Sequence, residues 1–255
     1  MLLAFWLVIS PTTAGAWTLP QGTLKTFNGV TSSSASKRYD THGVLQGPAV
    51  FNKILIQNWI EYGVTDAFTL VVAPQYVIAE TGTVDGGRVN VSSFSMEAGG
   101  RLLLTQRLGM LSLQASAKSA GAFDMSISAS GEGGRQYELR LLNGHGFKLA
   151  GHDAFFDIEF ARRWIKRPRP DEYVLDMTLG LWVMRNDLIM LQGFSVFSGE
   201  GVRRPYEPYR QSKFEISLVH RFSRRLSLQS GYFTTPLGRN TVRETGFVAT
   251  IWFQV

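Results

Sequence analysis

The feature that most constrains this chain is a strict alternation of tight turns and longer connections between runs of alternating apolar residues. The first tight turn lies within Glu61-Tyr62-Gly63-Val64-Thr65-Asp66, and four more lie within 105–116, 149–160, 183–194 and 219–233. A soluble sandwich has no reason to sort its connections by parity, whereas an outer-membrane barrel has short periplasmic turns and longer outer loops. The alternation therefore predicts a membrane-spanning β-barrel.

The longer connections carry most of the Gly, Pro, Asp and Asn, as loops do. They are expected at 31–47, 81–88, 124–135, 166–172, 199–210 and 234–241. Between turns and loops lie about twelve runs of about 9 to 13 residues, enough to cross a bilayer when tilted. We expect an all-β, antiparallel, up-and-down barrel of about 12 strands in the bacterial outer membrane, with both chain ends in the periplasm.

The first residues, MLLAFWLVISPTTAGA, are typical of a secretory signal peptide, with cleavage expected after Ala14-Gly15-Ala16. No Lys or Arg precedes the apolar run, which is irregular for such a segment. The predicted division is a signal peptide at 1–16 and one barrel domain at 17–255, because no linker interrupts the rest. The chain has no Cys, so disulfides and thiolate metal sites are excluded.

Period-two alternation also predicts which side chains face the lumen. Placing Asp157 and Glu159 inward sends Phe156, Ile158 and Phe160 to the lipid, and the reverse would put two carboxylates in hydrocarbon. The same reasoning applied to the other strands predicts a lumen that is polar and mixed in sign. Its predicted charged residues are Glu97, Arg101, Glu138, Arg140, Asp157, Glu159, Asp176 and Glu215.

Two stretches resist this assignment. Pro74 falls in the middle of the third strand, where it removes a ladder donor and predicts a bulge or a local break. In Gln57-Asn58-Trp59-Ile60 no assignment places every polar residue inside.

Two motifs carry a resemblance to a known family: Trp17-Thr18-Leu19-Pro20-Gln21-Gly22 and Glu61-Tyr62-Gly63-Val64-Thr65-Asp66. Together they resemble a broad group of proteobacterial outer-membrane barrels, often labelled as transporters and named for a meta-pathway of phenol degradation. The resemblance implies a barrel that passes small or apolar molecules. It brings no catalytic residues.

Catalysis and metal binding find little support in the sequence. Barrel lipases need a His beside a Ser, and none of His42, His145, His152 and His220 has a Ser two residues on. A site built from His145, His152 and Asp153 fits no standard ligand spacing. We predict neither an enzyme nor a cofactor.

Basic residues gather in the predicted outer loops, as Arg167, Arg169, Arg203, Arg204 and Arg210. One interpretation is pairing with lipopolysaccharide phosphates, because Arg binds phosphate in a bidentate manner. The other is an electropositive entrance that attracts anionic solutes.

The net charge of +6 is spread along the chain, so nucleic-acid binding is not predicted. The leading function is a passive channel for small solutes, and the alternative is a non-conducting structural or assembly barrel with a plugged lumen. The sequence leaves open the solute, the oligomeric state and a membrane protein partner.

Overall fold

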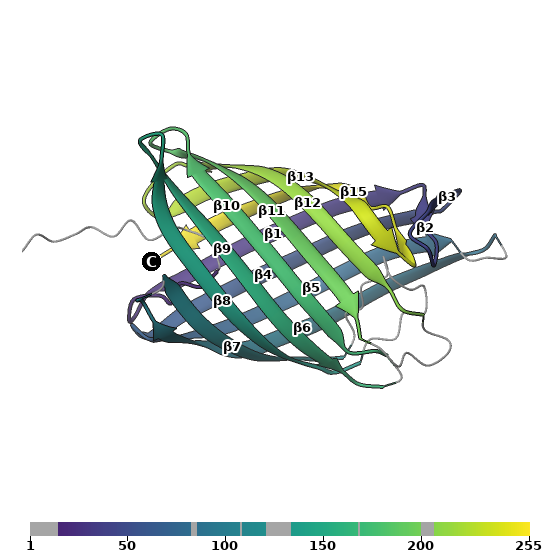
Figure 1. The fold of residues 1–255 in the computed structure, drawn as a ribbon, viewed down its shortest axis with the longest axis horizontal. Helices are drawn as coiled ribbons and strands as arrows, with labels where there is room; N and C mark the ends of the chain where they lie inside the picture. The colour runs from purple at the N-terminus through teal and green to yellow at the C-terminus, as the bar shows by residue number, and fades with distance from the viewer. Residues whose placement is uncertain (1–14, 83–85, 108, 121–133, 168, 200–206) are drawn as a thin grey trace, which may run out of the picture.

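The computed structural model is a closed antiparallel barrel of twelve strands (Figure 1). It describes residues 15–82, 86–107, 109–120, 134–167, 169–199 and 207–255. The predicted all-β barrel is confirmed. Its strands are β1 (Leu24–Ala35), β4 (Phe51–Thr65), β5 (Phe68–Gly82), β6 (Arg88–Thr105), β7 (Met110–Lys118), β8 (Gln136–Leu149), β9 (His152–Ile165), β10 (Glu172–Trp182), β11 (Asp187–Ser198), β12 (Arg210–Arg221), β13 (Leu226–Arg239) and β15 (Thr245–Gln254).

The tight turns lie at the end of the barrel that carries the C-terminus, and the longer connections lie at the other end (Figure 1). The turn between β8 and β9 shows why the tight ends need particular residues. Gly151 adopts a φ of 85°, a conformation that a residue without a Cβ adopts at no steric cost. A small sheet, β14 (Thr241–Val242), β2 (Arg38–Tyr39) and β3 (Leu45–Gln46), lies at the long-loop end.

The prediction of a loop at 234–241 is wrong, because β13 continues to Arg239. The register of β12 against β13 shifts there, since Ser212 faces Leu237 while Phe214 faces Thr234. β13 thus has one more residue than β12 in this interval, as in a β-bulge. A bulge accommodates Pro236, which has no N–H for the ladder. The loop predicted at 124–135 falls almost wholly outside the described residues.

The outer face carries a belt of exposed apolar side chains that a soluble protein would bury. Phe94, Phe214 and Phe247 are 60%, 57% and 68% exposed. Among the described residues, no helix is long and apolar enough to cross a membrane. The belt is the surface that a barrel presents to lipid.

The structure shows how the two stretches that resisted assignment are accommodated. Pro74 causes a local break and no bulge: β4 and β5 lose two pairs, between Gln57–Gln75 and Ile60–Val72, but keep their register. Trp59 and Gln57 line an internal cavity. Asn58 has the opposite parity and pairs directly with Asn28 of β1, so one polar pair lies on the outer face.

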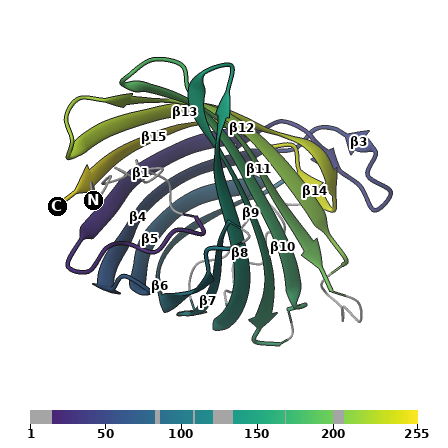
Figure 2. The same ribbon diagram turned by 60° about the vertical axis from the view of Figure 1, so that its left-hand side comes forward.

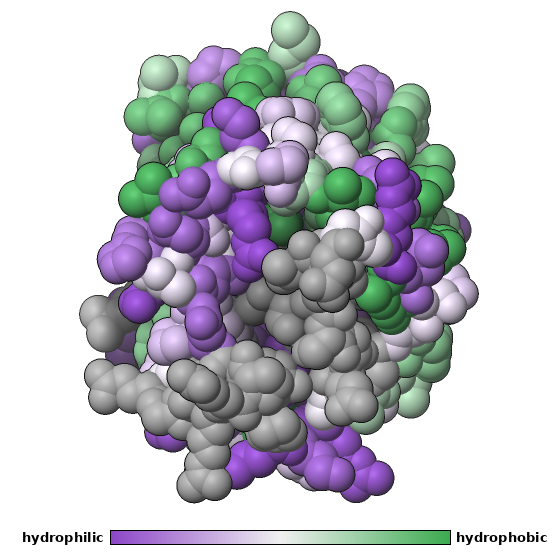
Figure 3. Space-filling view, turned by 90° about the vertical axis from the view of Figure 1, so that its right-hand side faces the viewer, coloured by the Kyte–Doolittle hydropathy of each residue, from purple (hydrophilic) through white to green (hydrophobic). Residues whose placement is uncertain are grey.

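The barrel closes where β1 pairs with β15, and each backbone N–H of Leu24 and Val255 donates to the carbonyl of the other at 2.9 Å. Viewed from the long-loop end, hydrophilic residues gather around the mouth while apolar residues occupy much of the perimeter (Figure 3). The molecule therefore has a polar entrance and an apolar wall.

Candidate functional site

The segment before β1 runs inside the barrel, near the end with the tight turns (Figure 2). The N–H of Ala16 donates to Asp157 Oδ2 of β9 at 3.0 Å, and the Ser112 hydroxyl of β7 donates to the Ala16 carbonyl at 2.5 Å. The N–H of Leu19 donates to Thr69 Oγ1 of β5 at 2.8 Å. Residues 15–19, which we call the N-terminal segment, thus contact three strands on one side of the barrel wall, and residues 17–19 are those that the predicted cleavage leaves on the mature chain.

Two glycines of the wall make room for this part of the chain. A Cβ at Gly144 would lie 2.5 Å from the Trp17 ring, and a Cβ at Gly63 would lie 2.1 Å from the Pro20 carbonyl oxygen. The Trp17 ring also meets Phe155 edge to face, with ring centroids 5.9 Å apart. Each of these contacts places the chain close against the inner wall.

Arg101 links the N-terminal segment to the wall. Its Nη1 donates to the Trp17 carbonyl at 3.0 Å, its Nη2 lies 2.8 Å from Glu61 Oε1, and its Nε donates to Gln114 Oε1 at 3.1 Å. The side chains of Arg101 and Glu61 are each 1% exposed. Removal of one partner of such a buried pair would leave an unpaired charge, at a cost of roughly 3–5 kcal/mol, so Glu61 fixes the Arg101 side chain that holds the Trp17 carbonyl.

Apolar side chains fill the lumen beside the segment. Five buried residues from four strands form one cluster: Phe155, Leu188, Met190, Val219 and Trp252. Trp17, Phe27 and Trp182 pack against it. The part of the barrel near the tight turns is therefore packed much like a protein core.

Charged side chains form a connected network on the inner face of β8, β9 and β10. Arg140 lies 2.7 Å from Glu138, 2.5 Å from Glu159 and 2.6 Å from Asp176. Arg163 lies 2.8 Å from Glu138 and 2.6 Å from Glu172. Glu159 and Asp176 are direct cross-strand neighbours, which like charges disfavour unless a cation lies between them. Arg140 supplies that cation.

The network continues to the long-loop end through Tyr209, whose hydroxyl donates to Glu172. Burial raises the pKa of the Tyr209 hydroxyl, and the Glu172 charge raises it further. At the same end the buried Glu244 lies 2.7 Å from Lys53 and 2.7 Å from Lys213. The inner wall thus carries both signs of charge, largely neutralised in pairs.

An internal cavity of about 290 Å³ lies among the strands on the other side of the barrel. Amide, hydroxyl and carboxyl groups line it together with three aromatic rings. Its lining includes Gln57, Gln192, Glu215, Gln229, Thr250, Phe27, Trp59 and Phe194.

The eight residues predicted for the lumen lie on strands whose opposite parity carries the exposed apolar belt. Six of them, including Asp157, join the contacts described above. Of the others, Glu97 accepts a hydrogen bond from Ser116 at 2.6 Å, and Glu215 accepts one from Ser217. Asp157 contacts the backbone of the N-terminal segment. A role for any of them in solute passage stays a prediction.

The predicted outer-loop arginines differ among themselves. Arg167 is exposed, whereas Arg169 is 5% exposed, so it is not a free loop cation. Arg210 is not in a loop, because it is the first residue of β12 and pairs with Phe197. Arg203 and Arg204 lie outside the described residues.

The residues that sequence reasoning missed are those of the N-terminal segment and its seats, Trp17, Gly144 and Glu61. The only signals were the two motifs at 17–22 and 61–66, which carry no period and whose mutual contact, such as Gln21 N–H to Asp66 Oδ1 at 2.9 Å, the sequence does not show. Asp153, one of the three residues considered for a metal site, lies 2.8 Å from Lys148 Nζ. In the described part of the chain, no three His, Cys, Asp or Glu residues are grouped to hold a metal ion.

No family model and no curated protein matches this chain. Among solved structures, it is similar to an outer-membrane channel from Pseudomonas putida, with a TM-score of 0.70, 12% identity, and coverage of 95% of this chain and 99% of that one. It is also similar to the translocator domain of the autotransporter NalP from Neisseria meningitidis, with a TM-score of 0.57, 11% identity, and coverage of 92% and 89%.

A third similar structure is the NanC porin, with a TM-score of 0.53, 9% identity, and coverage of 91% and 100%. At these identities the likeness concerns the fold. The closed barrel, its apolar belt and this likeness indicate the bacterial outer membrane. The naming for a phenol-degradation pathway stays a prediction.

Proposed function

We propose that the barrel is a passive outer-membrane channel for small solutes, and that the N-terminal segment sets its narrowest point. The observation that carries the proposal is that Trp17 and Leu19, which the predicted cleavage leaves on the mature chain, lie inside the barrel and are held there by non-covalent contacts with β5, β6 and β9. A constriction of this kind can move without disturbing the barrel wall.

The internal cavity supports small solutes with both apolar and polar groups. Its volume of about 290 Å³ is at the lower end for a small-molecule site. Its rings offer apolar contact, while its amides offer donors and acceptors. Because the charges of the wall are paired, we expect weak selectivity between anions and cations.

The similar structures support the general class of channel and not a particular solute. One is an outer-membrane channel and another a porin, whereas the autotransporter translocator is equally compatible with another task. The alternative is a barrel that conducts nothing, and the apolar cluster around Trp252 favours it. Conductance measurements separate the two.

A disulfide tests the proposal directly, because the natural chain has no Cys. Leu19→Cys with Thr69→Cys joins the segment to β5 at a point where backbone and side chain already lie within 2.8 Å. We expect wild-type protein to give small conductance steps in planar bilayers. The oxidised double variant should give far fewer, and reductant should restore them.

The single variant Leu19→Cys is the matched control, and reductant should leave its conductance unchanged. Wild-type protein that inserts but gives no steps would favour the non-conducting barrel. Equal conductance of the oxidised and reduced double variant would show that the segment does not set the narrowest point.

A further inference from the structure

Five arginine and aromatic residues, one on each strand from β9 to β13, form a row across the outer face of the sheet. Following the register from β9 to β13, Arg162 pairs with Tyr173, Tyr173 with Phe197, Phe197 with Arg210, and Arg210 with Arg239. Cross-strand partners point to the same side of a sheet. We call these five residues the rim row.

The rim row faces lipid and not the lumen. Arg210 shares its parity on β12 with Phe214, Ile216 and Leu218, all of which are exposed apolar residues. On β9, Arg162 shares parity with Phe160, which stacks on Tyr173. The row lies at the long-loop end of these strands, so it borders the outer leaflet, with apolar side chains directly below it.

The arginines of the row are held by rings more than by carboxylates. Arg210 lies 5.1 Å over Phe197, and Arg162 lies 5.2 Å over Trp164 and 5.7 Å over Tyr173. Within the described residues, no carboxylate forms a salt bridge with Arg210 or Arg239, and Arg162 reaches only Asp171, at 3.8 Å. Arg210 and Arg239 are direct cross-strand neighbours, and like charges so placed repel.

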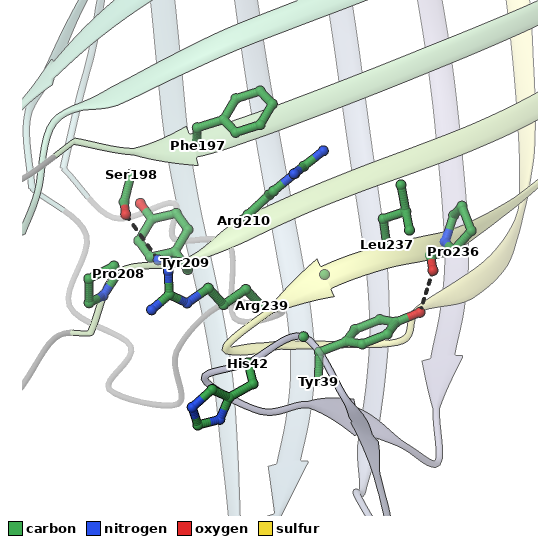
Figure 4. Close-up of a pocket in the computed structure, with 12 residues that line it drawn as sticks. Tyr39, His42, Phe197, Ser198, Pro208, Tyr209, Arg210, Pro236, Leu237 and Arg239 are labelled. Carbon is green, nitrogen blue, oxygen red and sulfur yellow. Dashed lines mark hydrogen bonds between the residues drawn. The ribbon is translucent and has the colours of Figure 1, made fainter.

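A groove adjoins this pair of arginines (Figure 4). Its volume is about 500 Å³, and its lining includes His42, Phe197, Tyr209, Arg210, Leu237 and Arg239. In Figure 4 the Arg239 side chain extends toward Pro208, while Arg210 lies on the wall beside Phe197. The two side chains extend in opposite directions, so each guanidinium group is presented to a separate part of the rim (Figure 4).

We propose that the rim row binds a phosphorylated glycolipid of the outer leaflet, with its phosphates on the arginines and its acyl chains on the apolar belt. Arginine matches phosphate geometry with two parallel hydrogen bonds. Arg162 and Arg210 are three strands apart, a distance of roughly 14 Å at the usual strand spacing. Two separated basic points suit a headgroup with two phosphates, as in lipopolysaccharide, better than a phospholipid with one.

The test compares two variants that each remove two arginines. Arg210→Gln with Arg239→Gln changes the rim row, and Arg224→Gln with Arg225→Gln changes the turn at the opposite end of β12 and β13. Detergent-solubilised proteins are titrated with deep-rough lipopolysaccharide, and bound lipid is counted by native mass spectrometry. Unchanged heat-modified migration on gels verifies that each variant folds.

We expect the rim-row variant to bind lipopolysaccharide about tenfold more weakly or worse, and the turn variant to bind as wild type does. Wild-type protein should bind dephosphorylated lipid A at least about tenfold more weakly, and its affinity for lipopolysaccharide should fall with added salt. This salt titration needs no variant.

Equal binding by the two variants would overturn the proposal, as would salt-independent binding. If phosphatidylglycerol bound as tightly as lipopolysaccharide, the row would be a phospholipid site. If inorganic phosphate displaced lipopolysaccharide at low millimolar concentration, it would be a free-anion site.

Discussion

Gly144→Ala should loosen the N-terminal segment and raise conductance. The added Cβ would lie 2.5 to 2.8 Å from three carbons of the Trp17 ring, whereas carbon atoms pack at about 3.5–4.0 Å. The ring must therefore retreat by roughly 1 Å, which disrupts its edge-to-face contact with Phe155. Such a contact is worth about 0.5–1.5 kcal/mol. A loss of about 1 kcal/mol raises the displaced fraction of the segment about fivefold.

Single-channel recording in planar bilayers measures this change as open probability. Gly146→Ala is the matched control, because it lies two residues along the same strand and its nearest neighbour is a carbonyl oxygen at 4.0 Å. We expect wild-type behaviour from Gly146→Ala and more frequent openings from Gly144→Ala. Identical open probability in the two variants would refute the link between Trp17 and the constriction.

Three further predictions follow from the network, one turn and the topology. Arg140→Gln should lower the free energy of unfolding by about 3 kcal/mol, because three carboxylates lose their shared cation. Urea titration followed by gel migration measures this change, and an unchanged unfolding midpoint would contradict it. The backbone N–H groups of Val44 and His42 hold the pKa of Asp40 below its usual value, so this turn should be stabilised above about pH 4 and lose that stabilisation as the pH falls through the lowered pKa. Amide exchange at Val44, corrected for its intrinsic rate, should rise at low pH in wild type but not in Asp40→Asn. A tag inserted within 199–210 should bind antibody on intact cells and one within 63–66 should not, and the reverse would invert the topology.

The barrel was predictable because its wall depends on local rules. Period-two alternation decides which side chains face lipid, since a carboxylate such as Glu159 is costly in hydrocarbon. Turn length then orders the strands, because consecutive strands pair in an up-and-down barrel. Both rules act within about fifteen residues, so one sequence suffices to apply them.

The interior was less predictable because its contacts are not local. The hydrogen bond from Arg101 to the Trp17 carbonyl joins residues 84 positions apart, and no period in the sequence connects them. Arg210 shows a different limit. Its basic neighbours suggested a loop, but the strand begins one residue earlier than composition indicates, and this places the side chain against lipid. The signal peptide predicted at 1–16 falls largely outside the described residues and stays a prediction.

The position of the N-terminal segment also sets an order of assembly. Its partners belong to β5, β6, β7 and β9, so its seat does not exist until more than half of the chain has been laid into the wall. Contacts that close long loops form late, because the chain loses conformational entropy before these contacts can stabilise it. The first residues to be synthesised therefore reach their native position late in folding. Because Trp17 also packs against the cluster that includes Trp252 of β15, protection of its ring from solvent should be complete only after β15 has joined the wall, which makes Trp17 a natural reporter of the finished barrel.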